Sequence, residues 1–277
     1  MKGPAPRLLG VIGWPVAHSL SPRLHNFWLR QHNIDATYQP LPVRPEALAE
    51  TLRGLHQRGF IGVNITIPHK ETACGLVDSC DATATFIGAV NTIIIGADGK
   101  RHGTNTDAFG FAENVRNAGH DCRSGPALVL GAGGAARAVL AALRAEACPQ
   151  IFLANRTRAR AEQLAATLDP TIKTIAWEQR EAILPEIKLL VNTTSLGMVG
   201  QEPLVLNLDT LPCDAAVNDL VYKPLHTPLL RAAAARNLRA IDGLGMLLYQ
   251  AQAAFHHWFA ITPAITQTLR DFILAPE

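Results

Sequence analysis

Cysteine is scarce in this chain of 277 residues, and its spacing fits neither a metal site nor a disulfide framework. The cysteines are scattered, form no C-x-x-C motif and are odd in number, whereas metal sites and disulfide-rich secreted domains need close or paired thiols. We therefore expect no metal ion, reduced thiols and a cytoplasmic location. The five thiols are those of Cys74, Cys80, Cys122, Cys148 and Cys213.

An excess of one charge and long apolar runs are also missing. Lys and Arg number 25 and Asp and Glu 23, which leaves a formal charge of +2 without a dense basic run. Nucleic acids and anionic membrane surfaces attract clustered positive charge, so we expect neither as a partner. No segment approaches the ~18 consecutive apolar residues that a membrane helix needs, and no apolar signal core follows the first charges.

What the sequence does contain is the composition of a compact protein, with 48% hydrophobic residues. The length exceeds that of a usual single core, which predicts two domains. Residues 128–140 (LVLGAGGAARAVL) follow the order buried strand, glycine turn, alanine-rich helix. This order matches the G-x-G-x-x-G/A dinucleotide fingerprint, with Gly131, Gly133 and Ala136 in its three positions.

A physical reason explains why each fingerprint position carries a small residue. Gly131 permits the sharp turn, Gly133 lets the backbone approach a pyrophosphate, and Ala136 keeps the helix close to the strand. The free N–H groups at the start of the helix then face the diphosphate. Packing alone can also produce a glycine- and alanine-rich helix start, but the strand before the turn and the helix after it favour the dinucleotide site.

The next strand, residues 151–154, ends in a cationic segment, Asn155 to Arg160 (NRTRAR). A site for NAD places an acidic residue about 20 positions after the fingerprint, on the ribose 2′-hydroxyl. Here a neutral amide and three arginines stand instead, and guanidinium groups pair with a 2′-phosphate. The cofactor predicted is NADP. A merely solvated helix start is disfavoured, because cations at a helix N-terminus oppose its dipole.

Four polar places in the first half of the chain have a structural interpretation, and the first of them also has a functional one. Ser21 before Pro22 predicts a helix N-cap, and with Ser19 it also suits a small anion such as a carboxylate. Residues 61–67 (GVNIT at their centre) predict a half-buried strand whose polar side chains face solvent. Lys70 follows in a first helical turn, as a surface lysine would, and Asp107 is placed to cap the next helix.

Further strands and helices complete an α/β pattern. The pattern predicts that Gln250, on a helix after residues 241–245, either fills the interior or reaches a ligand. Ligands in open α/β sheets bind outside the carboxyl ends of the strands, where residues 192–198 form a polar turn. The remaining predicted strands are 8–14, 36–43, 89–95 with its hairpin partner ending at 103–107, 171–175, 188–192 and 215–220.

Seven motifs in this order resemble those of the shikimate dehydrogenases of the shikimate/quinate dehydrogenase family, and the resemblance spans almost the whole chain. The family reduces 3-dehydroshikimate to shikimate with NADPH, in the synthesis of chorismate and aromatic amino acids. Each motif alone is weak, but the ordered set is highly specific. They are GWPVAHSLSP, GVNITIPHKE, GAVNT, GTNTDAFG, GAGGAAR, NRTRAR and DGLGMLLYQ.

The resemblance implies a role for specific residues. Lys70 and Asp107 would form a catalytic acid–base pair, which replaces the surface-lysine and cap-only interpretations. The substrate carboxylate would meet Ser19, Ser21 and Tyr222. The ring hydroxyls would meet Asn64, Thr66, Lys70, Asn91, Asp107 and Gln250. The cofactor would meet Gly131, Ala132, Gly133, Gly134, Ala135, Asn155, Arg156, Thr157, Arg160, Thr194, Leu220 and Gly243, although some relatives carry methionine in place of Leu220.

The resemblance also implies a division into domains, and other functions remain as alternatives. Residues 1–107 and 240–277 would form an α/β substrate-binding domain, and residues 108–239 an inserted Rossmann-type NADP-binding domain, with a cleft between them. One alternative is a quinate/shikimate dehydrogenase with broader substrate or NAD use. A methylenetetrahydrofolate dehydrogenase fits the motifs less well, and a non-catalytic NADP-binding sensor would not need the acid–base pair. A monomer and a homodimer both remain open.

Overall fold

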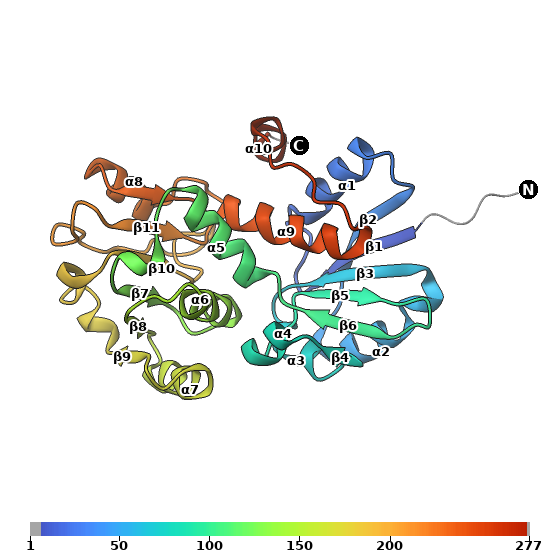
Figure 1. Cartoon of the computed structure of the whole chain (residues 1–277), viewed down its shortest axis with the longest axis horizontal. Coiled ribbons are helices and arrows are strands. Elements are labelled where there is room, and N and C mark those ends of the chain that lie inside the picture. The colour runs from blue at the N-terminus through green and yellow to red at the C-terminus, as the bar shows by residue number, and fades with distance from the viewer. Residues whose placement is uncertain (1–6, 276–277) are drawn as a thin grey trace, which may run out of the picture. The chain divides into compact units, whose positions relative to one another are not determined.

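The computed structural model describes residues 7–275, which divide into two compact units (Figure 1). The first contains the chain up to Thr106 and again from Gln250 onward, and the second contains Asp107–Tyr249. The boundary expected near residue 240 therefore differs, because residues 240–249 belong to the second unit. The reason is close packing: a methyl group at Gly245 would lie 1.8 Å from Oδ1 of Asn114, within this unit.

The first unit is built on a mixed six-stranded sheet in the order β2-β1-β3-β5-β6-β4. Strand β1 pairs in parallel with β2 and β3, whereas β3, β5 and β6 pair antiparallel. The strands are β1 (Arg7–Gly13), β2 (Ala36–Pro42), β3 (Phe60–Ile65), β4 (Ser79–Cys80), β5 (Thr92–Ile95) and β6 (Arg101–Thr104). The helices are α1 (Ser21–Gln31), α2 (Leu48–Gly54), α3 (Lys70–Cys74), α4 (Ala82–Ile87), the second half of α9 (Gly243–Phe259) and α10 (Gln267–Leu274).

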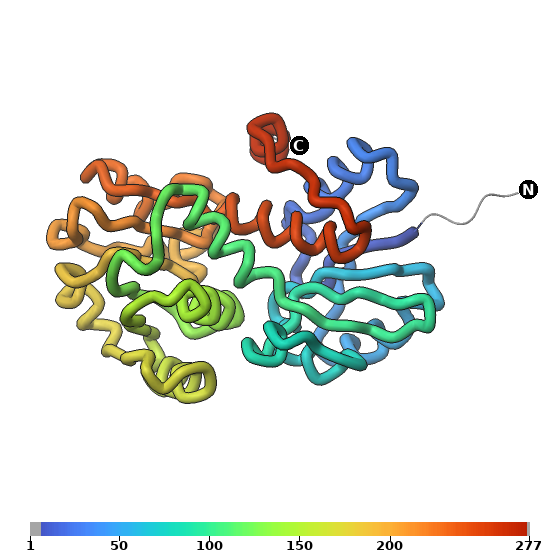
Figure 2. The backbone as a smooth tube through the Cα atoms, in the orientation of Figure 1, coloured from blue at the N-terminus to red at the C-terminus, as the bar shows by residue number. Residues whose placement is uncertain are grey.

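The C-terminal segment completes the first unit beside its N-terminal helix. The tube in Figure 2 shows the red end of the chain returning to the blue helix α1. There Phe27 packs against Phe272 with ring centroids 5.1 Å apart, and the Arg23 guanidinium lies over the same ring at 4.6 Å. The indole N–H of Trp258 donates a hydrogen bond to the carbonyl of Ile93 in β5 at 3.1 Å. Residues at opposite ends of the sequence therefore share one core.

The second unit is a parallel six-stranded sheet in the order β9-β8-β7-β10-β11-β12. In chain order these strands are numbered 3-2-1-4-5-6, which is the dinucleotide-binding arrangement. The strands are β7 (Ala127–Leu130), β8 (Ile151–Ala154), β9 (Lys173–Ile175), β10 (Leu189–Asn192), β11 (Ala216–Asp219) and β12 (Arg239–Ile241). The helices are α5 (Asp107–Asn117), α6 (Gly134–Ala145), α7 (Arg158–Leu168), α8 (Pro228–Ala235) and the first half of α9.

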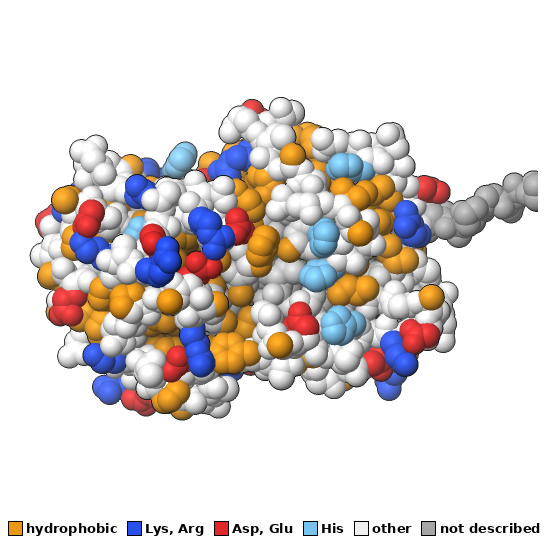
Figure 3. All heavy atoms as spheres, in the orientation of Figure 1, with side chains coloured by type: hydrophobic (Ala, Val, Ile, Leu, Met, Phe, Trp, Pro, Cys, Tyr) orange, Lys and Arg blue, Asp and Glu red, His pale blue; other side chains and the backbone are white. Residues whose placement is uncertain are grey.

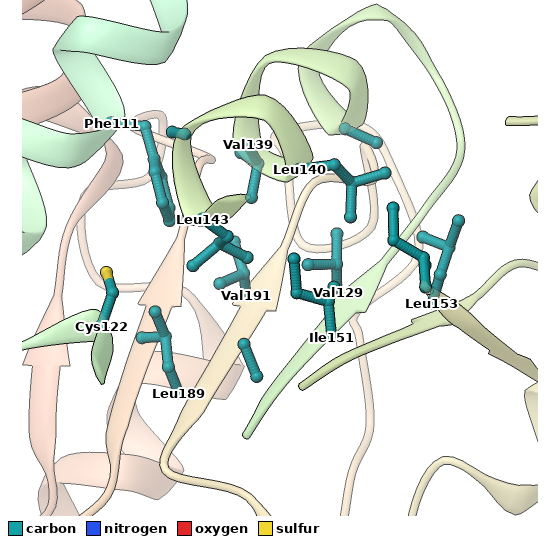
Figure 4. Close-up of a cluster of buried hydrophobic side chains, with 14 of the residues drawn as sticks. Phe111, Cys122, Val129, Val139, Leu140, Leu143, Ile151, Leu153, Leu189 and Val191 are labelled. Carbon is teal, nitrogen blue, oxygen red and sulfur yellow. The ribbon is translucent and has the colours of Figure 1, made fainter. Parts of the chain in front are cut away.

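The core of the second unit explains why its strands are apolar throughout. Parallel strands covered by helices on both faces are buried on both sides, and all four residues of β7, β8 and β10 are buried. Figure 4 shows Val139, Leu140 and Leu143 of α6 projecting toward Val129 and Val191 of the sheet. The predicted α/β fold is confirmed, and its strands form two sheets.

Several local predictions differ from the structure. Strand β3 does not alternate between buried and exposed residues, because neighbouring elements cover both faces and Asn64 is buried. Ser21 is the first residue of α1 rather than its cap, and no side chain caps this helix. Asp107 is likewise the first residue of α5. Strands β4 and β12 were not predicted because two or three residues carry too little periodicity to be recognised.

Candidate functional site

The fingerprint turn lies at the point where the strand order of the second unit reverses. Gly131 follows β7 with φ of 108°, a conformation that favours glycine. A methyl group at Gly131 would lie 2.6 Å from Oγ1 of Thr193 and 3.0 Å from Cγ2 of Thr194, in the loop after β10. The two loops therefore meet at the carboxyl ends of adjacent strands, which is where open α/β sheets bind ligands.

The residues after Gly131 fit a pyrophosphate group. Gly133 is the exposed N-cap of α6, and a methyl group there would meet no described atom within 4 Å. Ala136 is fully buried against the sheet, so the helix start is held close to the strand. The first turn of α6 contains no acidic side chain that would compete with an anion for its N–H groups. This turn can hold a diphosphate.

The arginines after β8 are available to an anion. Arg158 is paired with Glu162 at 2.8 Å, whereas the guanidinium groups of Arg156 and Arg160 are exposed and make no ion pair or hydrogen bond to any of residues 7–275. The amide of Asn155 donates to the carbonyl of Thr157 at 2.8 Å and so fixes the start of α7. Uncompensated cations at a helix N-terminus fit a phosphate group, and the residues therefore suit NADP.

A buried polar network shapes the neighbouring loops of the second unit. The amide of Asn192 donates to Asp219 at 2.9 Å, and the hydroxyl of Thr227 donates to the other oxygen of the same carboxylate at 2.6 Å. The hydroxyl of Thr194 in turn donates to Oδ1 of Asn192 at 2.7 Å. Burial raises the pKa of Asp219, and the hydrogen bond from Thr227 acts against that rise. The network fixes the loops that follow β10 and β11.

Leu220, Tyr222 and Gly243 lie in or beside the loop after β11. A methyl group at Gly243 would lie 2.2 Å from the carbonyl oxygen of Leu220, so only glycine allows α9 to start this close to the strand end. Leu220 is half-buried, and its N–H donates to the carbonyl of Asn192 at 3.0 Å. Burial raises the pKa of the Tyr222 phenol, which keeps it protonated and able to donate a hydrogen bond.

In the first unit, Asn64 lies within a second buried network. Asn64 is 5% exposed and accepts a hydrogen bond from the hydroxyl of Tyr38 at 2.6 Å. Its amide nitrogen donates to Oγ1 of Thr92 at 3.0 Å and to the carbonyl of Asn91 at 3.2 Å. Strands β2, β3 and β5 are thereby joined by polar side chains at one end of the sheet.

The same network extends to Asn91 and Gln250. The amide nitrogen of Asn91 donates to Oγ1 of Thr106 at 2.9 Å and to Oε1 of Gln250 at 3.4 Å. Its Oδ1 accepts from the N–H of Thr106 at 2.8 Å and from the hydroxyl of Thr92 at 3.0 Å. Three of the residues predicted to meet ring hydroxyls, Asn64, Asn91 and Gln250, are therefore brought together although 186 positions separate the first from the last.

The remaining predicted residues of the first unit lie on short turns. Oγ of Ser19 accepts from the N–H of Ser21 at 3.3 Å, so the two hydroxyls share one turn at the start of α1. Thr66 follows β3 and packs on the end of β1, where a methyl group at Gly13 would lie 2.4 Å from its Cγ2. Lys70 begins α3 and is half-buried, and its carbonyl accepts from Val90 at 2.9 Å.

Asp107 and Lys70, the two residues of the predicted catalytic pair, belong to different units. Asp107 is 5% exposed at the start of α5 and belongs to the second unit, whereas Lys70 belongs to the first. The sequence points to Asn192 only as the first residue of the polar turn 192–198, and it does not single out Tyr38 or Asp219. Asp219 stands at the end of a predicted parallel strand, a signal that could have revealed it, whereas Tyr38 carries no comparable signal.

A patch of charge or a cluster of metal ligands would mark a further binding site on the face drawn in Figure 3 or among the titratable groups of residues 7–275. On the face drawn in Figure 3, positive and negative side chains are mixed over the second unit without a patch of one sign. Within residues 7–275, no three His, Cys, Asp or Glu side chains gather so that they could hold a metal ion. In the same range, no helix has both the length and the apolarity that crossing a bilayer requires.

Comparison with known proteins decides the family. The family model of the shikimate dehydrogenase substrate binding domain matches residues 11–93, and that of shikimate / quinate 5-dehydrogenase matches residues 113–207. The chain is 52% identical over 277 residues to the shikimate dehydrogenase (NADP(+)) of Paramagnetospirillum magneticum, covering 99% of this chain and 100% of that one. The chain belongs to the shikimate dehydrogenase family. The resemblance carried by the seven motifs is confirmed.

Solved structures agree with this assignment. Shikimate 5-dehydrogenase from Thermus thermophilus, in complex with NADP(H) and shikimate, is 38% identical with a TM-score of 0.86, covering 96% of this chain and 97% of that one. Quinate dehydrogenase from Corynebacterium glutamicum, in complex with NAD, is 28% identical with a TM-score of 0.89, covering 97% and 99%. These two structures share the fold although one holds NADP(H) and the other NAD.

Proposed function

We propose that this chain is an NADP-dependent shikimate dehydrogenase, which reduces 3-dehydroshikimate reversibly to shikimate in the synthesis of chorismate and aromatic amino acids. The observation that carries the proposal is the 52% sequence identity, over 99% of this chain, to a shikimate dehydrogenase (NADP(+)). The unpaired guanidinium groups of Arg156 and Arg160 support NADP over NAD, because they would pair with the 2′-phosphate.

In the proposed arrangement, the first unit binds the substrate and the second binds the cofactor. The hydroxyls of Ser19 and Ser21, with Tyr222, hold the carboxylate, and the amides of the first-unit network meet the ring hydroxyls. The further substrate residues are Asn64, Thr66, Lys70, Asn91, Asp107 and Gln250. The cofactor residues are the turn at 131–135 together with Asn155, Arg156, Thr157, Arg160, Thr194, Leu220 and Gly243.

The chemical step needs a proton donor at the substrate. NADPH, when bound, supplies a hydride to the C3 carbonyl carbon. As negative charge develops on the carbonyl oxygen, the Lys70 ammonium donates a hydrogen bond to that oxygen and then a proton. Asp107 accepts from the adjacent hydroxyl and orients the lysine. In the reverse direction Lys70 removes the proton from the C3 hydroxyl.

Location and assembly complete the proposal. We place the protein in the cytoplasm, because its five cysteines are scattered and odd in number, which does not fit the disulfide framework of a secreted domain. The enzyme acts as a monomer or a homodimer on a small-molecule substrate.

The test is a spectrophotometric assay of reduced nicotinamide with the purified full chain. We expect absorbance to rise with shikimate and NADP+, and to rise far less with quinate or with NAD. Lys70→Ala should lower kcat by roughly 10²- to 10⁴-fold, the usual contribution of a positioned acid or base, and change KM for shikimate much less. Lys100→Ala, in the exposed hairpin turn of the same unit, is the matched control and should leave both constants unchanged.

The outcomes separate the alternatives. Equal rates with quinate or NAD would make the chain a broader quinate/shikimate dehydrogenase. Binding of NADP without turnover of shikimate or quinate would leave the non-catalytic sensor. A Lys70→Ala variant with mainly a raised KM would show that the lysine binds substrate and does not transfer the proton.

A further inference from the structure

The hydrogen bonds of Asn64 fix which way its amide points. The backbone carbonyl of Asn91 can only accept a hydrogen bond, so the atom facing it at 3.2 Å must be the amide nitrogen of Asn64. The second hydrogen of that nitrogen goes to Oγ1 of Thr92 at 3.0 Å. Both donor hydrogens are therefore used within the protein, and the opposite atom, Oδ1, must face Tyr38.

The Tyr38 hydroxyl consequently acts as a donor. It lies 2.6 Å from Oδ1 of Asn64, an atom that can only accept. A carbonyl oxygen has two lone pairs, and this hydrogen bond takes one of them. The His25 ring also lies near Asn64, but neither of its nitrogens makes a hydrogen bond within residues 7–275, so Tyr38 is the one donor to Oδ1 of Asn64 among these residues. Its second lone pair is the remaining hydrogen-bonding capacity of this side chain.

The Tyr38 ring is held rigidly by aromatic neighbours. The His25 ring stacks on it with centroids 4.3 Å apart and an interplanar angle of 12°, and Trp258 packs at 6.1 Å. Burial raises the pKa of Tyr38 well above its ordinary value, while the hydroxyl of Ser21 acts against that rise. The phenol therefore keeps its proton and can donate it in the hydrogen bond to Oδ1 of Asn64.

We propose that Tyr38 is a positioning residue for substrate recognition: its hydroxyl fixes the Asn64 amide so that the free lone pair of Oδ1 accepts a hydrogen bond from a ring hydroxyl of the substrate. This inference rests on the proposed function and deepens it. Asn64 then recognises a hydroxyl only as a donor, and a ring position that carries a carbonyl, an ether or a fluorine loses the contact.

The first test is the variant Tyr38→Phe, which removes the hydroxyl and keeps the ring stack. We expect KM for shikimate to rise roughly five-fold, the scale of one lost hydrogen bond, with kcat and KM for NADP changed less than about two-fold. Tyr249→Phe makes the same chemical change in the second unit and should leave KM for shikimate unchanged.

A double-mutant cycle separates positioning from a general effect on packing. If Tyr38 acts through Asn64, Tyr38→Phe should have almost no effect on KM in the Asn64→Ala background. Effects that multiply would overturn the proposal, as would a single variant with the KM of the original chain. An original chain that does not oxidise shikimate would instead refute the proposed function, so the two failures are distinguishable.

Two further measurements keep the test decisive if Tyr38→Phe folds poorly. Thr92→Val removes the acceptor of the Asn64 amide and should raise KM for shikimate, whereas Thr92→Ser keeps the hydroxyl and should restore it. Shikimate analogues with fluorine at C4 or at C5 should show the direction of the hydrogen bond, since fluorine cannot donate. One of them should bind more weakly to the original chain and lose this penalty in Asn64→Ala; equal penalties in both proteins would contradict the donor assignment.

Discussion

A buried histidine should make the first unit sensitive to acid, and replacing it should remove much of that sensitivity. His25 is fully buried, and neither ring nitrogen has a hydrogen-bond partner within the described residues. Burial lowers its pKa from 6.5 to about 3, although the nearby Asn64 acts in the opposite direction. Protonation of His25 in the folded protein is therefore strongly disfavoured, whereas the unfolded chain takes up the proton readily.

The size and sign of the effect follow from linkage. Between about pH 6.5 and pH 3 the unfolded state binds more protons than the folded state, so the free energy of unfolding falls as the pH falls. Each pH unit in this window costs about 1.4 kcal/mol, which gives about 2.7 kcal/mol at about pH 4.5 relative to neutral pH. Above about pH 6.5 the histidine is neutral in both states and this contribution is constant.

The perturbation is His25→Phe, which retains a ring against Tyr38 and removes the titrating nitrogens. Urea unfolding at about pH 7.5, 5.5 and 4.5 should show a variant whose stability falls with acid by about 2 to 3 kcal/mol less than that of the original chain. Replacing His226, which is exposed in the second unit, with Gln is the control and should keep the original pH dependence. Parallel pH profiles for the original chain and His25→Phe would refute the assignment.

Two other predictions concern the second unit and its packing. The double variant Arg156→Ala and Arg160→Ala should raise KM for NADP at least ten-fold more than KM for NAD, because only NADP carries the 2′-phosphate; equal increases would remove the phosphate assignment. Gly245→Ala should lower the free energy of unfolding by about 1 to 3 kcal/mol, since its methyl group would collide with Oδ1 of a buried asparagine. Gly54→Ala, in a helix with open space around it, should instead raise stability by about 0.4 to 1 kcal/mol, and thermal melts of the two variants compare them.

Local signals in the sequence were sufficient to predict the glycine turn between β7 and α6. Gly131, Gly133 and Ala136 lie within six residues of one another, and in the structure Gly131 has a positive φ and Ala136 is fully buried. The strand order could also be anticipated, since alternating strands and helices fold into a parallel sheet with few allowed topologies. The positions of Arg156 and Arg160 after β8 followed directly from that order.

Contacts between distant residues were beyond sequence reasoning. The alternation in residues 61–67 places Asn64 on a solvent face, and only the family resemblance placed it in the substrate site; in the structure Tyr38 of β2 and Thr92 of β5 enclose it. Ser21 was expected to cap a helix that instead begins one residue earlier than a Ser21 cap requires. In both cases the decisive partner comes from another part of the fold, and no local pattern in the sequence encodes it.

The split of the first unit between the two ends of the chain has a consequence for biosynthesis. Residues up to Thr106 leave the ribosome long before Gln250 is made, and in the folded chain Oε1 of Gln250 accepts a hydrogen bond from the Asn91 amide. Trp258, whose indole covers Gly62 and donates a hydrogen bond to β5, is made later still. The amino-terminal part of the first unit therefore lacks these contacts until the last segment of the chain emerges, and its core is completed last.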